Sequence, residues 1–342
     1  MRYAKSLLVP LLGLTLCGAG LAHAAEPVPI RAAWIVPVTN LGSILFDKPG
    51  IARNNGKTYK FEATHYQGTT LELNALATGE LDMGLLSYTS LPLAIENAHL
   101  GDLRVIIDES EDGYRGGYST EYFVRRDSNI KSVGDLKGKV VATNAIGSAV
   151  GLTMRVELLK HGIDPKNGDV NVVEAPFPTM KTMLLSGKAD LVPGALPFST
   201  DPELRSKGRV LFTELDAMGG PSDLVFWVAR KSFLDKHRAA VLDFMTDYLR
   251  AVRFYTDPKN RAEGVQIAAK FTKLPASVFD KFLFMPGKDI YRVPDGVPQA
   301  AILQSNIDVL YKYHQLAKTV QIAPYVDPSL IEEAGKRLKD EK

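Results

Sequence analysis

The chain has 342 residues, of which 41 are Lys or Arg, 39 are Asp or Glu, and one is Cys. A single cysteine excludes an intramolecular disulfide framework. Nearly balanced charge with no basic run gives no electrostatic basis for binding nucleic acid, so we expect no nucleic-acid partner. The length suits roughly two domains of about 100–200 residues each.

The first 24 residues are predicted to be a secretory signal peptide. Arg2 and Lys5 form a basic start, the apolar run "SLLVPLLGLTLCGAGL" follows, and "AHA" offers a small-residue cleavage site. We expect cleavage after Ala24 rather than lipidation of Cys17, because Leu16 stands where a small residue is needed. The mature chain would then be formally neutral and free of cysteine. We expect it in the periplasm, with no stable membrane insertion.

Strand-like and helix-like segments alternate in two successive sets. The first set has apolar strands at residues 30–38, 59–66, 82–86 and 103–110, with helices starting near Thr69 and Thr89. The second set has strands at residues 139–144, 170–175, 189–196 and 208–215. This alternation predicts an α/β fold with largely parallel sheets. From residue 231 the pattern is mostly helical.

The stretch "SDLVFWVAR" (residues 222–230) follows the second set and is predicted to return to the first sheet. The chain would therefore cross twice between two lobes, near residues 117–123 and 221–226. Lobe 1 would comprise residues 25–120 and 224–342, and lobe 2 residues 121–223. Two crossings create a hinge and a cleft at the carboxyl ends of both sheets.

Three stretches occur in a characteristic order: "YQGTTLELNALATGELDMGLLSYTS", "VRRDSNIKSVGDLKGKVVATNAIGSAVGLTMRVELLKHGI" and "VVEAPFPTMKTMLLSGKADLVPGALPF". Together they resemble the periplasmic substrate-binding proteins of ABC importers, in the nitrate/sulfonate/taurine branch, over residues 30–273. The resemblance implies a two-lobed, type II-like periplasmic-binding-protein fold with two crossover strands and a helical C-terminal segment. It also implies a small-molecule ligand and delivery to an ABC permease with its ATPase.

The sequence departs from that branch at one point. Many members carry a tryptophan and an aspartate where this chain has Ala195 and Leu196. The ligand therefore stays open among sulfonates, taurine, nitrate, aromatic carboxylates and heterocycles. We further expect a monomer without a cofactor, and without a metal because no HExxH motif or cysteine pair occurs.

Small and polar residues occur at the junctions where a predicted strand is followed by a predicted helix. Such junctions expose unpaired N–H groups at the positive end of the helix, which suits an anion or a polar oxygen. Each of these residues is also a good helix cap, so the prediction of a pocket depends on their convergence. The candidates are Thr39, Asn40, Gly68, Thr69, Thr70, Ser87, Thr89, Asn144, Gly147, Ser148 and Ala149.

Aromatic residues beside these junctions are candidates for pocket walls. Tyr66 and Tyr88 each adjoin a polar junction, and Phe177 follows a strand between two prolines. The alternative for each is a place in the core. Arg115 lies near the first crossing and is predicted to pair with an acidic group of the ligand; its alternative partners are Glu111 and Asp112.

Two functions remain open at this point. The first is a solute receptor that closes its hinge on a ligand. The second is an enzyme on the same scaffold, since aromatic desulfinases and thiamine-pyrimidine synthases resemble these receptors. Those enzymes use cysteine, which the mature chain lacks, and no GxSxG motif is present. We therefore expect a non-enzymatic receptor with no catalytic residue.

Overall fold

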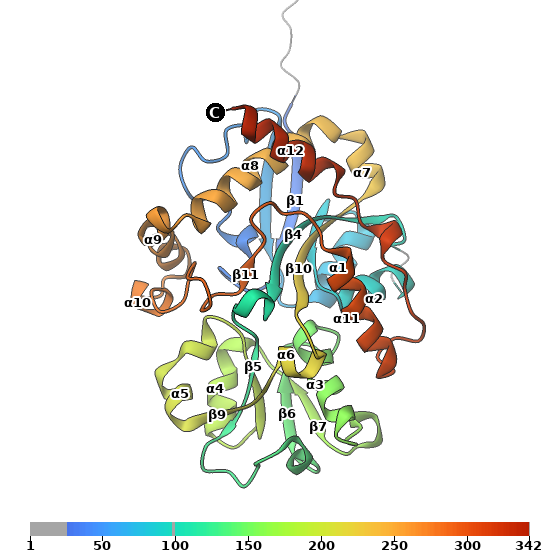
Figure 1. The fold of residues 1–342 in the computed structure, drawn as a ribbon, viewed down its shortest axis with the longest axis vertical. Helices are drawn as coiled ribbons and strands as arrows, with labels where there is room; N and C mark the ends of the chain where they lie inside the picture. The colour runs from blue at the N-terminus through green and yellow to red at the C-terminus, as the bar shows by residue number, and fades with distance from the viewer. Residues whose placement is uncertain (1–25, 98–99, 342) are drawn as a thin grey trace, which may run out of the picture.

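The structure is a computed structural model that describes residues 26–97 and 100–341, and it contains two lobes that each have a sheet of their own (Figure 1). The predicted leader, residues 1–24, lies outside the described residues. Within residues 26–97 and 100–341, no helix is long and apolar enough to cross a membrane. The predicted two-lobed α/β fold with two crossover strands is confirmed.

Lobe 1 is built on a six-stranded sheet with the order β11-β4-β10-β3-β1-β2. β1 runs parallel to both β2 and β3, whereas β10 runs antiparallel to both β3 and β4. The strands are β1 (Val28–Trp34), β2 (Tyr59–His65), β3 (Met83–Leu86), β4 (Leu103–Asp112), β10 (Ser222–Arg230) and β11 (Tyr291–Arg292).

Lobe 2 is built on a five-stranded sheet with the order β7-β6-β8-β5-β9. β6 runs parallel to β7 and β8, and β5 runs antiparallel to β8 and β9. The strands are β5 (Glu121–Arg125), β6 (Val140–Thr143), β7 (Asn171–Glu174), β8 (Leu191–Gly194) and β9 (Gly208–Thr213).

The two crossings follow one pattern in both lobes. β5 is the first strand after the chain leaves lobe 1, and it inserts antiparallel between β8 and β9. β10 is the first strand after the chain leaves lobe 2, and it inserts antiparallel between β3 and β4. The predicted return of residues 222–230 to the first sheet is therefore confirmed, and both connections run through the middle of the molecule (Figure 1).

Helices cover the faces of both sheets (Figure 1). Lobe 1 carries α1 (Thr69–Thr78), α2 (Ser90–Asn97), α7 (Lys231–Lys236), α8 (Arg238–Thr256), α9 (Arg261–Thr272), α10 (Ala276–Phe279), α11 (Ala300–Lys312) and α12 (Ser329–Asp340). Lobe 2 carries α3 (Ala149–Lys160), α4 (Phe177–Leu185), α5 (Pro202–Lys207) and α6 (Glu214–Met218). The helical C-terminal segment packs on lobe 1, so it supports the sheet that faces the gap.

The apolar core of lobe 1 continues into lobe 2. On one face of the sheet, fully buried Trp227 packs against Phe244 of α8, with ring centroids 5.6 Å apart. On the other face, Tyr88 belongs to a buried cluster that also contains Leu152 and Val156 of α3 in lobe 2. Burial of these side chains stabilises the contact between the lobes, because apolar surface leaves water there.

Candidate functional site

The loop after β1 is held rigidly at the edge of the gap. The Asn40 side-chain oxygen Oδ1 accepts hydrogen bonds from the backbone N–H groups of Ile35 and Val36, at 2.9 and 2.7 Å. Val38 has a φ of 68°, an unusual conformation for a β-branched residue, and its N–H donates to Ser43 Oγ at 2.9 Å. Strained, well-bonded backbone of this kind is typical of functional sites.

The corresponding junction in lobe 2 is the start of α3. The Ser148 hydroxyl oxygen accepts from the Gly151 N–H at 3.1 Å and lies 2.8 Å from Asn144 Oδ1. Gly151 has no room for a side chain, since an added Cβ would lie 2.5 Å from the Ala145 carbonyl oxygen. The N–H groups of the first two helical residues have no acceptor within the helix and remain available.

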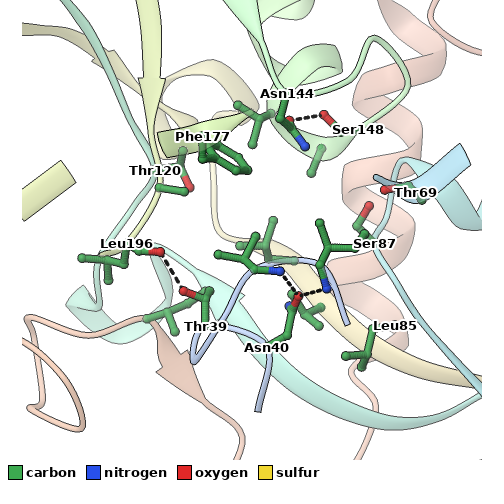
Figure 2. A pocket seen from close by; sticks show the side chains of 18 of the residues that line it. Thr39, Asn40, Thr69, Leu85, Ser87, Thr120, Asn144, Ser148, Phe177 and Leu196 are labelled. Carbon is green, nitrogen blue, oxygen red and sulfur yellow. Dashed lines mark hydrogen bonds between the residues drawn. The ribbon is translucent and has the colours of Figure 1, made fainter. Parts of the chain in front are cut away.

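These two junctions face one cavity between the lobes, with a volume of about 100 Å³ (Figure 2). Its lining follows the carboxyl ends of β1 and β3 in lobe 1 and of β6 and β8 in lobe 2. The lining residues are Ile35, Val36, Thr39, Asn40, Thr69, Leu85, Leu86, Ser87, Tyr118, Thr120, Asn144, Ser148, Ala149, Val150, Phe177, Ala195, Leu196, Leu224, Val225 and Ile290. Among these described residues, none carries a charged side chain.

Eight of the fifteen residues proposed from sequence line this cavity. They come from both lobes and share small or polar side chains, apart from the aromatic wall: Thr39, Asn40, Thr69, Ser87, Asn144, Ser148, Ala149 and Phe177. The Phe177 ring stacks on Phe198, with an interplanar angle of 7° and ring centroids 6.1 Å apart. Contact between these residues and a ligand stays a proposal.

Four other candidates lie at the contact between the lobes instead. Tyr88 is fully buried, and its hydroxyl lies 2.5 Å from Thr153 Oγ1 and donates to Glu214 Oε1 at 2.9 Å. The remaining three are Gly68, which faces Ala145, and Thr89 and Gly147, which approach each other. Their role in the structure is to join the lobes beside the cavity.

The last three candidates point elsewhere. The Tyr66 hydroxyl donates to Glu80 on the surface of lobe 1, and Thr70 is exposed on α1. The Arg115 guanidinium lies over the rings of Tyr114 and Tyr291 and lines a separate cavity of about 330 Å³. Its backbone is left-handed, with a φ of 48°.

Sequence reasoning missed most of the apolar part of the lining, with Ala149 and Phe177 as the exceptions. Leu85, Leu224 and Val225 belong to strands whose other residues form the core, so no local signal separates them from core residues. Ile290 comes from the segment between α10 and β11, for which the sequence offered no strand pattern. Position 196 was noted for its difference from relatives, and its carbonyl accepts a hydrogen bond from Thr39 Oγ1 at 2.8 Å.

Two buried carboxyl groups stand directly behind the lining. Glu109 accepts from the Leu41 N–H at 2.7 Å and from Trp227 Nε1 at 2.9 Å, and burial raises its pKa to about 7. Asp112 accepts from the N–H and the hydroxyl of Thr120, and burial raises its pKa to about 6. Both pKa values are therefore raised toward neutral pH. Asp112 bonds to Thr120 of the lining, and Glu109 bonds to Leu41, the chain neighbour of Asn40.

Three further carboxyl groups lie on β4 and β10, at the lobe 1 ends of the two crossings. Asp223 of β10 pairs in register with Glu111 of β4, and Asp108 lies three residues before Glu111. All three are fully buried, and neither oxygen of Asp108 or of Asp223 has a hydrogen-bond partner among the described residues. Burial raises the pKa of Glu111 to about 7, and burial together with neighbouring carboxyls raises those of Asp108 and Asp223 well above the usual range.

No three His, Cys, Asp or Glu side chains in residues 26–97 and 100–341 are arranged to hold a metal ion. Asp108, Glu111 and Asp223, which we call the hinge carboxyls, are among these residues. They form a group of buried acids. Their effect is expected in the pH dependence of stability.

One curated relative shares part of the sequence. A protein of Haemophilus influenzae named as a thiamine biosynthesis protein is 31% identical over 134 residues, which is 37% of this chain. The match spans 41% of that relative's own length, so less than half of it is compared.

Solved structures with the same fold include receptors and an enzyme. The alkanesulfonate-binding protein SsuA of Xanthomonas axonopodis matches with a TM-score of 0.69 at 20% identity, covering 90% of this chain and 100% of that one. The nitrate-binding protein NrtA of Synechocystis gives 0.69 at 14% identity, covering 92% and 90%. The desulfurization enzyme DSZB gives 0.65 at 14% identity, covering 91% and 99%. At these identities the likeness establishes the fold alone.

A family assignment follows from the sequence itself. The profile of the NMT1-like family matches residues 23–269, which is most of the chain and includes every strand of both sheets except β11 and every lining residue of the cavity except Ile290. The predicted resemblance to periplasmic substrate-binding proteins is confirmed in family and fold. This chain belongs to the NMT1-like family.

Proposed function

We propose that the protein is an extracytoplasmic solute receptor, which holds a small polar or anionic molecule between its lobes and delivers it to an ABC permease. The observation that carries this proposal is the cavity lined by both lobes, at the carboxyl ends of both sheets. Ligands of open α/β sheets bind at this edge. The predicted signal peptide and the receptors among the solved relatives support the same role.

The mechanism is hinge closure. A ligand that contacts Asn40 in lobe 1 and Asn144 in lobe 2 has more partners when the lobes are together, so it stabilises the closed state by its differential affinity. The Thr39–Leu196 hydrogen bond crosses the same gap and favours closure as well. We propose in addition that the ligand is sulfonate-like and that the partner is an ABC permease.

Native mass spectrometry of gently purified protein tests it. We expect a retained small molecule that disappears after unfolding and refolding, together with saturable one-to-one binding when candidates are titrated back. The proposal fails if the native and refolded proteins have the same mass and titration calorimetry detects no binding across sulfonates, carboxylates and heterocycles.

An enzyme on this scaffold is the second candidate, because DSZB and the thiamine-related protein are among the similar proteins. The lining described above offers no His, Cys, Asp, Glu or Lys, the side chains that most often act as acids, bases or nucleophiles. Incubation of purified protein with aromatic sulfinates distinguishes the two candidates. Release of sulfite above a buffer control would favour the enzyme, and unchanged substrate favours the receptor.

A further inference from the structure

The orientation of the Asn40 carboxamide is fixed by its surroundings. Its Oδ1 accepts two backbone N–H bonds, and a flipped amide would place the Nδ2 hydrogens against those same donors. Asn40 is only 5% exposed, yet it lines the cavity. None of the hydrogen bonds among the described residues uses its Nδ2, and Figure 2 draws bonds from its oxygen alone. A buried donor thus remains for whatever occupies the cavity.

Asn144 repeats this arrangement from the opposite lobe. In the structure its Oδ1 faces the Ser148 hydroxyl at 2.8 Å, which leaves its nitrogen on the cavity side (Figure 2). Ala149 and Val150 also line the cavity and are the first two residues of α3, whose N–H groups have no acceptor within the helix. The wall of lobe 2 therefore presents N–H donors too.

The described lining of this cavity offers hydroxyl oxygens as acceptors, and no carboxylate belongs to it. The Leu196 carbonyl already accepts from the Thr39 hydroxyl, and the nearest carboxyls, Glu109 and Asp112, are bonded to groups behind the wall. An ammonium group brings three donors and a positive charge, and its desolvation here would be compensated only by neutral hydroxyl oxygens, because no carboxylate lines the cavity. An oxyanion or carbonyl oxygen, by contrast, would find neutral N–H donors from both lobes and the positive end of α3.

We infer that Asn40 and Asn144 form a donor pair, one from each lobe, that selects ligands by their acceptor oxygens and rejects ligands carrying an ammonium group. This inference rests on the proposed function and narrows its ligand class to small organic oxyanions, carboxylates or sulfonates, with an apolar body. The body would lie against Phe177 and the aliphatic side chains of the lining. Taurine, which carries both groups, is expected to be a poor ligand.

Matched ligand pairs that differ by an ammonium group test the selection. The pairs are ethanesulfonate with taurine, propionate with β-alanine, and 3-phenylpropionate with phenylalanine, each titrated calorimetrically into refolded protein. We expect the ammonium-free member of at least one pair to saturate the site, with its partner at least about tenfold weaker. Equal or tighter binding of the ammonium-bearing members would overturn the inference.

Asn40→Asp is the sharpest variant, because the new carboxylate keeps the acceptor for Ile35 and Val36 while it loses the donor and adds a negative charge. We expect N40D to fold, to bind the ammonium-free oxyanion at least about tenfold more weakly, and to narrow or reverse the preference within each pair. Asn144→Asp should do the same from lobe 2. Asn171→Asp, which adds the same charge at an exposed position of β7, is the control and should leave binding unchanged.

Two further outcomes separate the inference from the proposed function. Unchanged affinity and preference in both N40D and N144D would overturn the donor pair while the receptor role stands. Binding of no member of any pair would also overturn it, whereas a small molecule retained in native mass spectrometry would leave the receptor role intact.

Discussion

The hydroxyl of Thr39 in lobe 1 donates to the carbonyl oxygen of Leu196 in lobe 2, at 2.8 Å. This hydrogen bond crosses the gap between the lobes at the edge of the cavity, where both residues also line the wall (Figure 2). Thr39 follows β1 of lobe 1 and Leu196 follows β8 of lobe 2, so this bond requires the two lobes to be together.

Thr39→Val should weaken ligand binding without changing the fold. Valine has nearly the same shape but cannot donate, and the Leu196 carbonyl loses its partner only in the closed state. A typical net loss of about 0.5–1.5 kcal/mol corresponds to roughly two- to tenfold lower affinity. Titration calorimetry measures it. Thr200→Val removes a similar bond within lobe 2, to the Pro197 carbonyl, and should leave affinity unchanged. Equal effects of the two variants would contradict the role of Thr39 in closure.

Tyr88→Phe should lower the free energy of unfolding by about 1–3 kcal/mol. The Tyr88 hydroxyl donates to Glu214, which is fully buried, and the substitution would leave that carboxyl without its partner. Urea unfolding measures the change. Tyr311→Phe is the control, because Tyr311 is 45% exposed, and its stability should match the wild type. An unchanged Tyr88→Phe variant would argue against this hydrogen bond.

The hinge carboxyls should make the protein less stable as pH rises from 4 to 8. The folded-state pKa of Glu111 is raised to about 7, those of Asp108 and Asp223 are raised well above the usual range, and Asp112 behind the lining adds a pKa raised to about 6. The folded chain therefore binds more protons than the unfolded chain in this window. Stability is therefore greatest below the unfolded-state values and is lost as pH passes the folded-state values. Each such group contributes a slope of about 1.4 kcal/mol per pH unit at most.

Asp223→Asn tests that assignment, because it removes one of the fully buried carboxyls from the cluster. Urea unfolding at pH 5 and pH 8 should show a smaller pH dependence than the wild type, with the variant relatively more stable at pH 8. Asp127→Asn, at a side chain that is 86% exposed, should keep the wild-type dependence. A wild-type protein that is more stable at pH 8 than at pH 5 would contradict the burial of these acids.

Binding of an oxyanion should take up protons near neutral pH. Glu109 and Asp112 stand behind the lining with pKa values of about 7 and about 6, and a nearby negative charge raises both. Affinity should therefore increase as pH falls from 8 to 6. Calorimetry in buffers of different ionisation enthalpy measures the proton uptake. Proton release on binding would place the anion away from these carboxyls.

The sequence predicted the sheets well because their strands are short apolar runs bounded by turn residues. β3, β6, β8 and β10 all fall within predicted segments, whereas β1 begins two residues before its predicted segment. The return of β10 could be anticipated since "SDLVFWVAR" follows the second set. β11 has two residues and no pattern, so the sequence offers no signal for it.

The site was predictable mainly in its polar part, together with Ala149 and Phe177. Ser148 and Thr69 could be predicted because they are polar residues at strand-to-helix junctions, and both line the cavity. The direction in which a side chain points depends on tertiary packing, however, and this packing places Tyr88 and Arg115 outside the cavity lining. Tyr88 points into the contact with α3, and Arg115 stacks on two tyrosines in another cavity. Neither orientation can be predicted from the local sequence pattern.

Hydrogen exchange, followed by mass spectrometry with and without ethanesulfonate, tests most directly whether one ligand engages both lobes. The account predicts that saturating ligand slows exchange together in the segments around Asn40 and Thr69 of lobe 1 and around Ser148 of lobe 2. Protection confined to one lobe, or protection that avoids these junctions while calorimetry shows saturation, would contradict it.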